Sequence, residues 1–281
     1  MKMVSADEVW NDSAPHPALF WSDYARSLGE FSSLSWSWPA LARAPKGDGH
    51  PVLVIPGLGA DDLSTVFLRR YLRHLGYRTY RWKLGTNLGP TAITVEGLPA
   101  RLAELADKTG QPVSVIGWSL GGIFARKLAR AEPESTRQVV TLGSPIRLAR
   151  RRHSNARTFY HLNRHRHVEE LPLPLEDGHG PLPVPSTSIY SRLDGVVAWR
   201  ACLDVTSKTS ENVEVFASHF GFGHHPAALY AVADRLAQAP GEWRPFSRPR
   251  WLRLAYPSPA TREAVDVGDG SAPAGEHPPR G

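Results

Sequence analysis

The sequence predicts an α/β fold, in which a mostly parallel central sheet carries helices on both faces. Two observations support this prediction. Between residues 50 and 145, short apolar segments alternate with longer amphipathic segments, as strands and helices do in such folds. The apolar segments are continuous rather than interrupted by polar residues, which is typical of strands buried on both faces of a sheet.

The elements can be placed in order along the chain. PVLVIPG predicts a strand, and the segment after it has apolar residues at helical spacing up to Gly76, where a helix would stop. A second amphipathic segment also closes at a glycine, Gly110. The expected strands are 51–57, 77–84, 112–117, 138–145, 186–191 and 213–218, and the expected helices are 61–77, 94–110, 120–133 and 225–238.

Changes in composition divide the chain into five segments. Residues 1–49 form a tryptophan-rich N-terminal extension that is expected to pack on the core. Residues 50–145 and 186–254 form the two parts of the core, and residues 146–185 form an insertion between two strands. The tail, residues 255–281, is polar and rich in proline and glycine, which predicts disorder.

The serine in VSVIGWSLGG is the first candidate for chemistry. Residues 117–121 match the pattern G-x-S-x-G between a predicted strand and a predicted helix, as the nucleophile-elbow interpretation requires. Such a turn strains the serine backbone, and side chains at Gly117 and Gly121 would collide with neighbouring elements. It lifts the Ser119 hydroxyl out of the sheet, beside the positive end of the next helix. We therefore expect Ser119 to be a nucleophile rather than an ordinary turn residue.

A serine nucleophile needs a base, and the base needs a carboxylate that orients it. In folds with this elbow, the three groups follow in the order serine, acid and histidine, the last two after later strands. Asp194 follows the predicted strand 186–191 in a turn that Gly195 permits, and it is the expected acid. Asp204 comes after a helical-looking stretch and Asp177 precedes the strand, so both are less well placed.

Three histidines follow the last predicted strand. His219 comes directly after that strand and before a Gly-Phe-Gly loop, and it is the expected base. His224 and His225 stand just before the last predicted helix. They could satisfy the N-terminus of that helix or face the pocket instead.

The oxyanion of a tetrahedral intermediate needs preorganised hydrogen-bond donors. One expected donor is the amide of Leu120, directly after the serine. The other is the amide of Leu58, because Gly57 and Gly59 let its loop approach the substrate, although these glycines would also suit a plain turn. Trp118 and Gly57 are expected to contact the substrate, and for Trp118 packing beneath the elbow fits equally well.

With these residues identified, the chain resembles the α/β-hydrolase superfamily, and within it the bacterial lipases and esterases. The resemblance is carried by VLVIPGLG (52–59), VIGWSLGG (115–122), YSRLDGVV (190–197) and SHFGFGHHPAAL (218–229). It implies an acyl-enzyme mechanism with Ser119, His219 and Asp194 as the triad. It also implies that residues 146–185 form a lid. Two features depart from many lipases: the oxyanion loop reads Ile-Pro-Gly rather than His-Gly, and the lid segment is rich in arginine and proline rather than amphipathic.

The expected function is hydrolysis of a carboxylic ester, with a small molecule or a lipid as substrate and without a metal or an organic cofactor. The same triad would serve an acyltransferase, in which an alcohol or a thiol replaces water, and the sequence does not separate the two reactions. A non-catalytic binding protein on a hydrolase fold is a third interpretation. All three expected catalytic positions are nevertheless filled.

The formal net charge of +6 comes largely from one basic stretch. Its members are Arg147, Arg150, Arg151, Arg152, His153, Arg157, His161, Arg164, His165, Arg166 and His167. Such a stretch could contact phosphate, an anionic membrane surface or an anionic substrate, or it could be a solvated loop. No nucleic-acid-binding motif accompanies it, so we expect no nucleic-acid partner.

Cys202 is the only cysteine, which excludes an intrachain disulfide and a multi-cysteine metal site. No apolar run is long enough to span a membrane. The stretch MKMVSADEVWNDSAPHP lacks the apolar segment that a secretory signal needs. We therefore expect a cytoplasmic protein.

Overall fold

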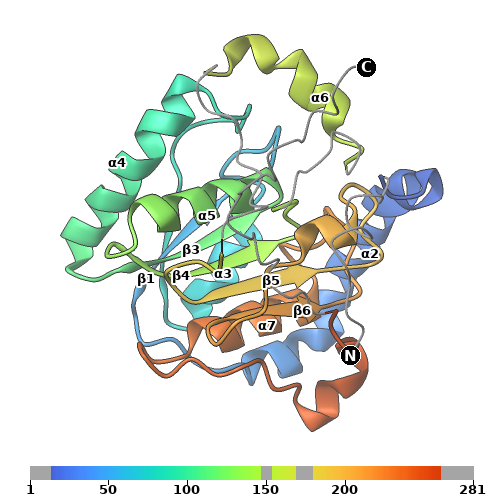
Figure 1. Cartoon of the computed structure of the whole chain (residues 1–281). Coiled ribbons are helices and arrows are strands. Elements are labelled where there is room, and N and C mark those ends of the chain that lie inside the picture. The colour runs from blue at the N-terminus through green and yellow to red at the C-terminus, as the bar shows by residue number, and fades with distance from the viewer. Residues whose placement is uncertain (1–13, 147–153, 169–179, 261–281) are drawn as a thin grey trace, which may run out of the picture.

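The computed structural model describes residues 14–146, 154–168 and 180–260 of the 281-residue chain (Figure 1). These residues contain a six-stranded sheet in the order β2-β1-β3-β4-β5-β6, and every neighbouring pair is parallel. The strands are β1 (Pro51–Ile55), β2 (Arg78–Arg81), β3 (Val113–Trp118), β4 (Thr136–Leu142), β5 (Ser186–Tyr190) and β6 (Ser210–Glu214). The predicted α/β fold is therefore confirmed.

Helices cover both faces of this sheet (Figure 1). The α-helices are α2 (Pro17–Ala42), α3 (Val66–His74), α4 (Ala92–Thr109), α5 (Leu120–Ala131), α6 (Arg157–Leu162) and α7 (Pro226–Leu236), and the 3₁₀ helices are η1 (Arg164–Arg166), η2 (Trp199–Cys202) and η3 (Arg250–Ala255). One hydrophobic core joins the sheet to α2, α3 and α7. A second core joins the opposite face to α4 and α5.

Strand β1 shows why the apolar segments of the sequence are continuous. Val52 and Val54 point into the core that contains α3 and α7, whereas Leu53 and Ile55 point into the core that contains α4 and α5. All four side chains are fully buried. A strand between two helical layers has no face in contact with solvent, so apolar side chains are favoured at all of its positions.

Strand β6 spans Ser210–Glu214, whereas the sequence predicts a strand at 213–218. The observed strand therefore begins three residues earlier and ends four residues earlier than predicted. Its partner β5 ends at Tyr190, whose carbonyl accepts a final hydrogen bond of 2.9 Å from the Val215 amide. The chain after Tyr190 then turns away, so the next residues of the β6 side have no strand to pair with. The apolar residues Val215 and Ala217 are nevertheless buried, which explains why they looked like strand positions.

Residues 17–42 form a long helix, α2, which the hydrophobic pattern does not predict. His16 accepts a hydrogen bond of 3.2 Å from the Ala18 amide, and Pro17 occupies the first turn, where a missing amide costs no helical hydrogen bond. The segment contains no valine, isoleucine or threonine, which are poor helix formers. Leu34 and Leu41 anchor α2 in the core that it shares with α7.

Candidate active site

Ser119 occupies the turn between β3 and α5. Its backbone has φ of 53° and ψ of −122°, a strained conformation for a residue with a side chain. A Cβ atom at Gly117 would lie 2.3 Å from the Gly121 carbonyl oxygen, and one at Gly121 would lie 2.5 Å from the Ile55 carbonyl oxygen. Both contacts are with backbone, which cannot move aside easily. The turn therefore requires glycine at both positions.

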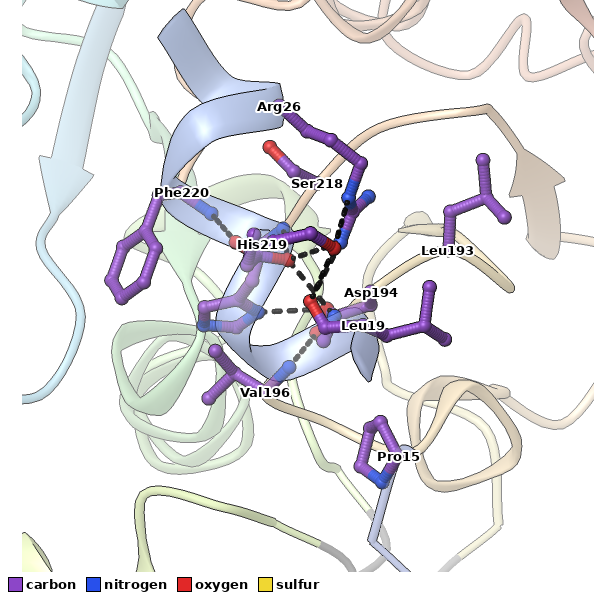
Figure 2. A network of polar contacts seen from close by, with 12 residues as sticks. Pro15, Leu19, Arg26, Leu193, Asp194, Val196, Ser218, His219 and Phe220 are labelled. Atoms are coloured by element: carbon purple, nitrogen blue, oxygen red, sulfur yellow. Dashed lines mark hydrogen bonds and ion pairs between the residues drawn. The ribbon is translucent and has the colours of Figure 1, made fainter. Parts of the chain in front are cut away.

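His219 and Asp194 are in contact in the loops that follow β6 and β5. Nδ1 of His219 lies 2.7 Å from Oδ2 of Asp194, and the two side chains face one another in Figure 2. Oδ1 of Asp194 accepts hydrogen bonds from the amides of Val196 at 2.8 Å and Val197 at 2.7 Å. The carboxylate is thus fixed by backbone on one side while it binds the imidazole on the other.

Burial and charge act in opposite directions on His219. Only 4% of His219 and 2% of Asp194 is exposed. Burial by itself lowers the pKa of His219, but the facing Asp194 carboxylate outweighs it, so the pKa of His219 is raised above its ordinary value. The Asp194 carboxylate therefore stabilises the protonated form of the His219 imidazole.

Trp118 connects the serine turn to the histidine loop. Its indole Nε1 donates a hydrogen bond of 3.1 Å to the carbonyl oxygen of His219. A Cβ atom at Gly223 would lie 2.9 Å from the Trp118 ring, which shows how closely the loop approaches the indole. The side chain is buried in the core that contains α7. These contacts show Trp118 packed against the loop that carries the histidine.

Gly143, at the end of β4, brings the acid loop to the same edge of the sheet. A Cβ atom at Gly143 would lie 3.0 Å from Oδ2 of Asp194 and 2.5 Å from the Phe222 ring. The residue also has φ of 52°, which favours glycine. The loops after β3, β4, β5 and β6 therefore meet at the carboxyl ends of the strands, where parallel sheets gather functional groups.

The loop after β1 lies against the serine turn. A Cβ atom at Gly57 would lie 3.2 Å from the Cβ of Ser119, so a side chain there would crowd the hydroxyl group. Leu58, one of the two expected oxyanion donors, is the next residue in this loop. Leu120, the other, is the first residue of α5, and its amide has no carbonyl one turn earlier in the helix to bond.

Asn87 holds the loop that carries Leu58, a role that the sequence pattern does not reveal. Its side-chain nitrogen donates to the Pro56 carbonyl at 2.8 Å, and its own carbonyl accepts from the Gly59 amide at 2.7 Å. Its amide donates to the Ala60 carbonyl at 2.8 Å. The fully buried Asn87 therefore fixes the backbone on both sides of Leu58.

The less favoured acids are not placed beside His219. Asp204 forms a buried ion pair with Arg126, with contacts of 2.6 Å and 2.9 Å, and it also accepts from the Ser186 hydroxyl at 2.7 Å. These contacts occupy both oxygens of the Asp204 carboxylate, so its role is structural. Asp177 lies outside the described residues.

The other two histidines have different surroundings. Nε2 of His224 lies 3.2 Å from the Ser27 hydroxyl and 3.0 Å from the Ser27 carbonyl oxygen, so this ring binds α2. Burial lowers its pKa. His225 immediately precedes α7, and burial lowers its pKa to about 4. Neither the His224 ring nor the His225 ring takes part in the contact between Asp194 and His219.

Ser114, His50 and Asp48 form a second series of contacts between a serine, a histidine and an aspartate. Nε2 of His50 lies 2.8 Å from the hydroxyl of Ser114, and its Nδ1 bonds Asp48. Ser114 lies within β3 and is fully buried, as is almost all of His50. Burial lowers the pKa of His50 despite the nearby carboxylate. A nucleophile without access to a substrate cannot react, so this set is structural.

The structure describes only part of the basic insertion. Arg147, Arg150, Arg151, Arg152 and His153 lie outside the described residues. The described part includes α6 and η1 and lies against two loops. The ring of Phe159 lies 3.0 Å from a Cβ position at Gly59, and Nε2 of His167 lies 2.8 Å from the Leu88 carbonyl oxygen. Arg164 and Arg166 are exposed.

Two carboxylates of α2 bind the loops of the site and were not expected from the sequence. Asp23 accepts hydrogen bonds from the backbone of both the acid loop and the histidine loop. Glu30 accepts from the amide of Ser218 at 2.7 Å and from its hydroxyl at 2.8 Å. Asp23 and Glu30 are spaced two helical turns apart, which places them on one face of a helix. This spacing was the only feature of the sequence that could have indicated their shared position.

The described residues give little support to a metal site, a reactive cysteine or a membrane-spanning helix. No group of three or more histidine, cysteine, aspartate and glutamate side chains among them is placed to hold a metal ion. Cys202 is buried, and burial raises the pKa of its thiol well above the ordinary value. Across residues 14–146, 154–168 and 180–260, no helix combines the length and the apolar character that crossing a membrane requires.

Comparison with known proteins identifies the fold. No model of a known protein family matches the sequence, and no curated protein matches it. The chain is similar in structure to lipase B of Aspergillus fumigatus, with a TM-score of 0.52 and 16% identity over 72% of this chain and 56% of that lipase. The chain therefore spans little more than half the length of that lipase.

Two further structures are similar at lower TM-scores. One is MGS-MChE2, an α/β-hydrolase enzyme from a lagoon-sediment metagenome in Morocco, with a TM-score of 0.46 and 19% identity over 64% of this chain and 87% of that one. The other is the lipase BlEst2 of Bacillus licheniformis, with a TM-score of 0.47 and 14% identity over 65% of this chain and 90% of that one. Together with the parallel sheet and the strained serine turn, the likeness to lipase B defines the class: this chain has the α/β-hydrolase fold.

Proposed function

We propose that the protein is a serine hydrolase that cleaves carboxylic esters through an acyl-enzyme intermediate. The observation that carries the proposal is the buried pair of His219 and Asp194, 2.7 Å apart, in loops that meet the strained turn of Ser119. The Trp118–His219 hydrogen bond supports the same arrangement from the serine side. Fold alone does not define function, so the proposal rests on this site.

The proposed reaction uses each group in a defined role. Nδ1 of His219 donates to Asp194, which leaves Nε2 as the acceptor for the hydroxyl proton of Ser119. The serine oxygen attacks the ester carbonyl, and the amides of Leu58 and Leu120 stabilise the oxyanion. The proton on Nε2 passes to the leaving alcohol as the ester C–O bond breaks. Water then attacks the acyl-enzyme with the same base, and the free acid leaves.

Gly57 supports the proposed position of the substrate. A side chain at this position would contact Ser119, so glycine leaves room for an ester carbonyl beside the hydroxyl. Trp118 is less suited to a substrate contact, because its exposed fraction is 8% and its indole is bonded to the histidine loop. We propose that Trp118 supports the base rather than the acyl chain.

A lipid-like ester is the substrate class that the surface of α2 favours. Trp21, Tyr24, Leu28 and Phe31 lie at helical spacing along this helix, and each is at least half exposed. Tryptophan and tyrosine are typical of membrane interfaces. Phe220, next to the proposed base, is also exposed. We call the four α2 residues the aromatic face, and we propose that it contacts a lipid surface.

The insertion is proposed to act as a lid. Phe159 of α6 lies on the loop that contains Leu58, so movement of α6 would change access to the proposed oxyanion donors. The exposed Arg164 and Arg166 of η1 support contact with an anionic membrane surface. The cytoplasmic location stays a prediction from the sequence, and acyl transfer by the same triad stays the alternative to hydrolysis.

The proposal is tested by hydrolysis of p-nitrophenyl esters from acetate to palmitate. We expect turnover by the wild type and its loss in Ser119→Ala. Ser114→Ala is a matched control, because it removes the serine of the buried set and should retain turnover. Labelling of the wild type and Ser114→Ala, but not Ser119→Ala, by a fluorophosphonate would support the nucleophile. Equal turnover by Ser119→Ala and the wild type would overturn the proposal, and added alcohol acceptors would distinguish acyl transfer from hydrolysis.

A further inference from the structure

Asp23 accepts hydrogen bonds from two loops that leave different strands. Its Oδ1 accepts from the amide of Gly195 at 2.9 Å and from the amide of His219 at 3.0 Å. Its Oδ2 accepts from the amide of Phe220 at 3.0 Å. Gly195 directly follows Asp194, so the fully buried carboxylate of Asp23 joins the backbone of the proposed acid loop to that of the proposed base loop.

The two loops are shaped to receive α2. A Cβ atom at Gly195 would lie 2.3 Å from the Leu19 carbonyl oxygen, which belongs to the helix backbone and cannot swing away. One at Gly221 would overlap the carboxylate of Glu30. Figure 2 shows the helix passing beside Asp194 and His219, with Leu19 and Arg26 on it. Close approach of α2 to both loops is therefore part of their packing.

The Asp194–His219 bond does not by itself hold these loops together. One loop follows β5 and the other follows β6, so their separation depends on the residues that bridge them. The Asp194–His219 bond joins the two loops at one point only, and the Trp118 indole restrains the histidine loop alone. Asp23 adds a second link, because one of its buried oxygens bonds both backbones and burial makes the loss of these hydrogen bonds costly.

Asp23 also contributes charge to the site. Burial lowers the pKa of His219, while the charges of Asp194 and, more weakly, Asp23 raise it, and the net result is a raised pKa. Arg26 lies 3.0 Å from Oδ1 of Asp23 and partly balances its charge. Among the other charged groups around these loops, Glu30 bonds Ser218 and Arg192 of the acid loop bonds Glu214. His224 bonds Ser27 and His225 precedes α7, while burial and, to a lesser extent, Asp194 raise the pKa of Cys202.

We propose that Asp23 is a positioning residue for the proposed ester hydrolysis. It holds the acid and base loops at the separation at which the Asp194–His219 contact forms, and so fixes the position of the imidazole. The inference rests on the proposed function and extends the site to the N-terminal helix. A displacement of about 1 Å in an active site can cost roughly 100-fold in rate, so a small relaxation of these loops would be measurable.

The experiment compares Asp23→Asn and Asp23→Glu with Glu30→Gln, a control on the same helix that bonds Ser218 but not His219. Active sites are first titrated with a fluorophosphonate, so that kcat refers to folded and reactive protein. For p-nitrophenyl butyrate, we expect kcat of Asp23→Asn to fall about 10- to 100-fold with little change in KM. Glu30→Gln should lower kcat less than Asp23→Asn does, because Glu30 bonds only the histidine loop and its substitution leaves Asp23 joining the two loops.

The pH profile separates positioning from general loss of structure. Removal of the Asp23 charge lowers the pKa of His219, so the imidazole stays neutral at lower pH. The acid limb of kcat/KM should therefore move to lower pH in Asp23→Asn. Asp23→Glu keeps the charge but displaces the carboxylate by one methylene group. It should lower kcat while leaving the acid limb in place.

Each outcome decides the inference. An active, labelled wild type with unchanged kcat and acid limb in Asp23→Asn would overturn it while leaving the proposed function intact. A wild type that is neither labelled nor active would overturn both. If Asp23→Asn does not fold, Asp23→Glu provides the test, because it keeps the charge and displaces the acceptor oxygens of the three amide contacts. A lowered kcat with an unmoved acid limb would support the inference, and an unchanged kcat would overturn it.

Discussion

The indole of Trp118 donates a hydrogen bond of 3.1 Å to the carbonyl oxygen of His219, so the residue before the proposed nucleophile supports the backbone of the proposed base. Trp118 is the last residue of β3 and His219 lies in the loop after β6, and these two strands are not neighbours in the sheet. The contact is independent of Asp194 and Asp23. It therefore fixes the histidine loop from the serine side, while the carboxylates fix it from the other.

Trp118→Phe should lower activity through this contact. The substitution keeps most of the buried ring but leaves the His219 carbonyl without its donor, which costs about 1–3 kcal/mol of stability. We expect kcat to fall about 10-fold as the histidine loop shifts. Trp82→Phe is the matched control, because it removes an equivalent bond of 2.9 Å from a buried indole to Gly85. Equal kcat in the two variants would contradict the role given to Trp118.

Activity and one contribution to stability should depend on pH in opposite directions. The raised pKa of His219 means that the folded state binds its proton more tightly than the unfolded state does. This contribution is fully present below the unfolded pKa of about 6.5 and is lost as pH rises through the folded value. Catalysis needs the neutral imidazole, so kcat/KM should rise over the same interval.

The measurement is kcat/KM and urea unfolding of the wild type between about pH 5 and 9. The acid limb of kcat/KM should be centred above about pH 6.5. His224 and His225 should not contribute to it, because burial lowers both pKa values, to about 4 for His225. An acid limb below pH 6 would show that the charge of Asp194 does not outweigh burial.

Substitution of the two buried aspartates should separate chemistry from stability. Asp194→Asn should lower kcat by roughly 10⁴-fold, since the imidazole loses the partner that sets its tautomer. Asp204→Asn breaks the buried ion pair with Arg126, and breaking such a pair costs about 3–5 kcal/mol. The folded fraction of that variant should keep its kcat per titrated site. A large loss of kcat in Asp204→Asn at full folding would favour Asp204 as the acid.

The aromatic face of α2 should bind lipid vesicles. Replacing Trp21 and Tyr24 together by serine removes two aromatic side chains that are 81% and 66% exposed. We expect binding to phosphatidylcholine vesicles to weaken at least about 10-fold, while turnover of a short soluble ester is unchanged. Leu254→Ser removes an exposed apolar side chain from η3 and serves as the control.

Vesicle composition distinguishes the aromatic face from the basic insertion. Binding that requires anionic lipid and disappears at high salt would place the contact at the arginines, because exposed charges are screened by salt. Equal binding of the wild type and the double variant to neutral vesicles would contradict the proposal for the aromatic face. Neutral and anionic vesicles therefore test different surfaces of the same protein.

The hydrophobic pattern of the sequence was sufficient for the fold of the central region. Strands such as β1 and β3 lie between two helical layers, so every position is apolar or small and the pattern is strong. The end of β6 was misplaced because Val215 and Ala217 are buried without a partner strand. Helix α2 was missed because its inner face carries Asp23 and Ser27 among its buried residues, which weakens the apolar periodicity.

The sequence by itself determined the strained turn at Ser119, because glycines at 117 and 121 are a local requirement of backbone packing. It also placed Asp194 and His219 after the strands that the structure shows as β5 and β6, since chain order follows from topology. Only the tertiary structure decided which carboxylate meets which histidine, and it alone brought Asp23, Glu30 and Asn87 to these loops. The physical reason is that such contacts join residues far apart in the chain, and a hydrogen bond over that distance leaves no periodic trace in the sequence.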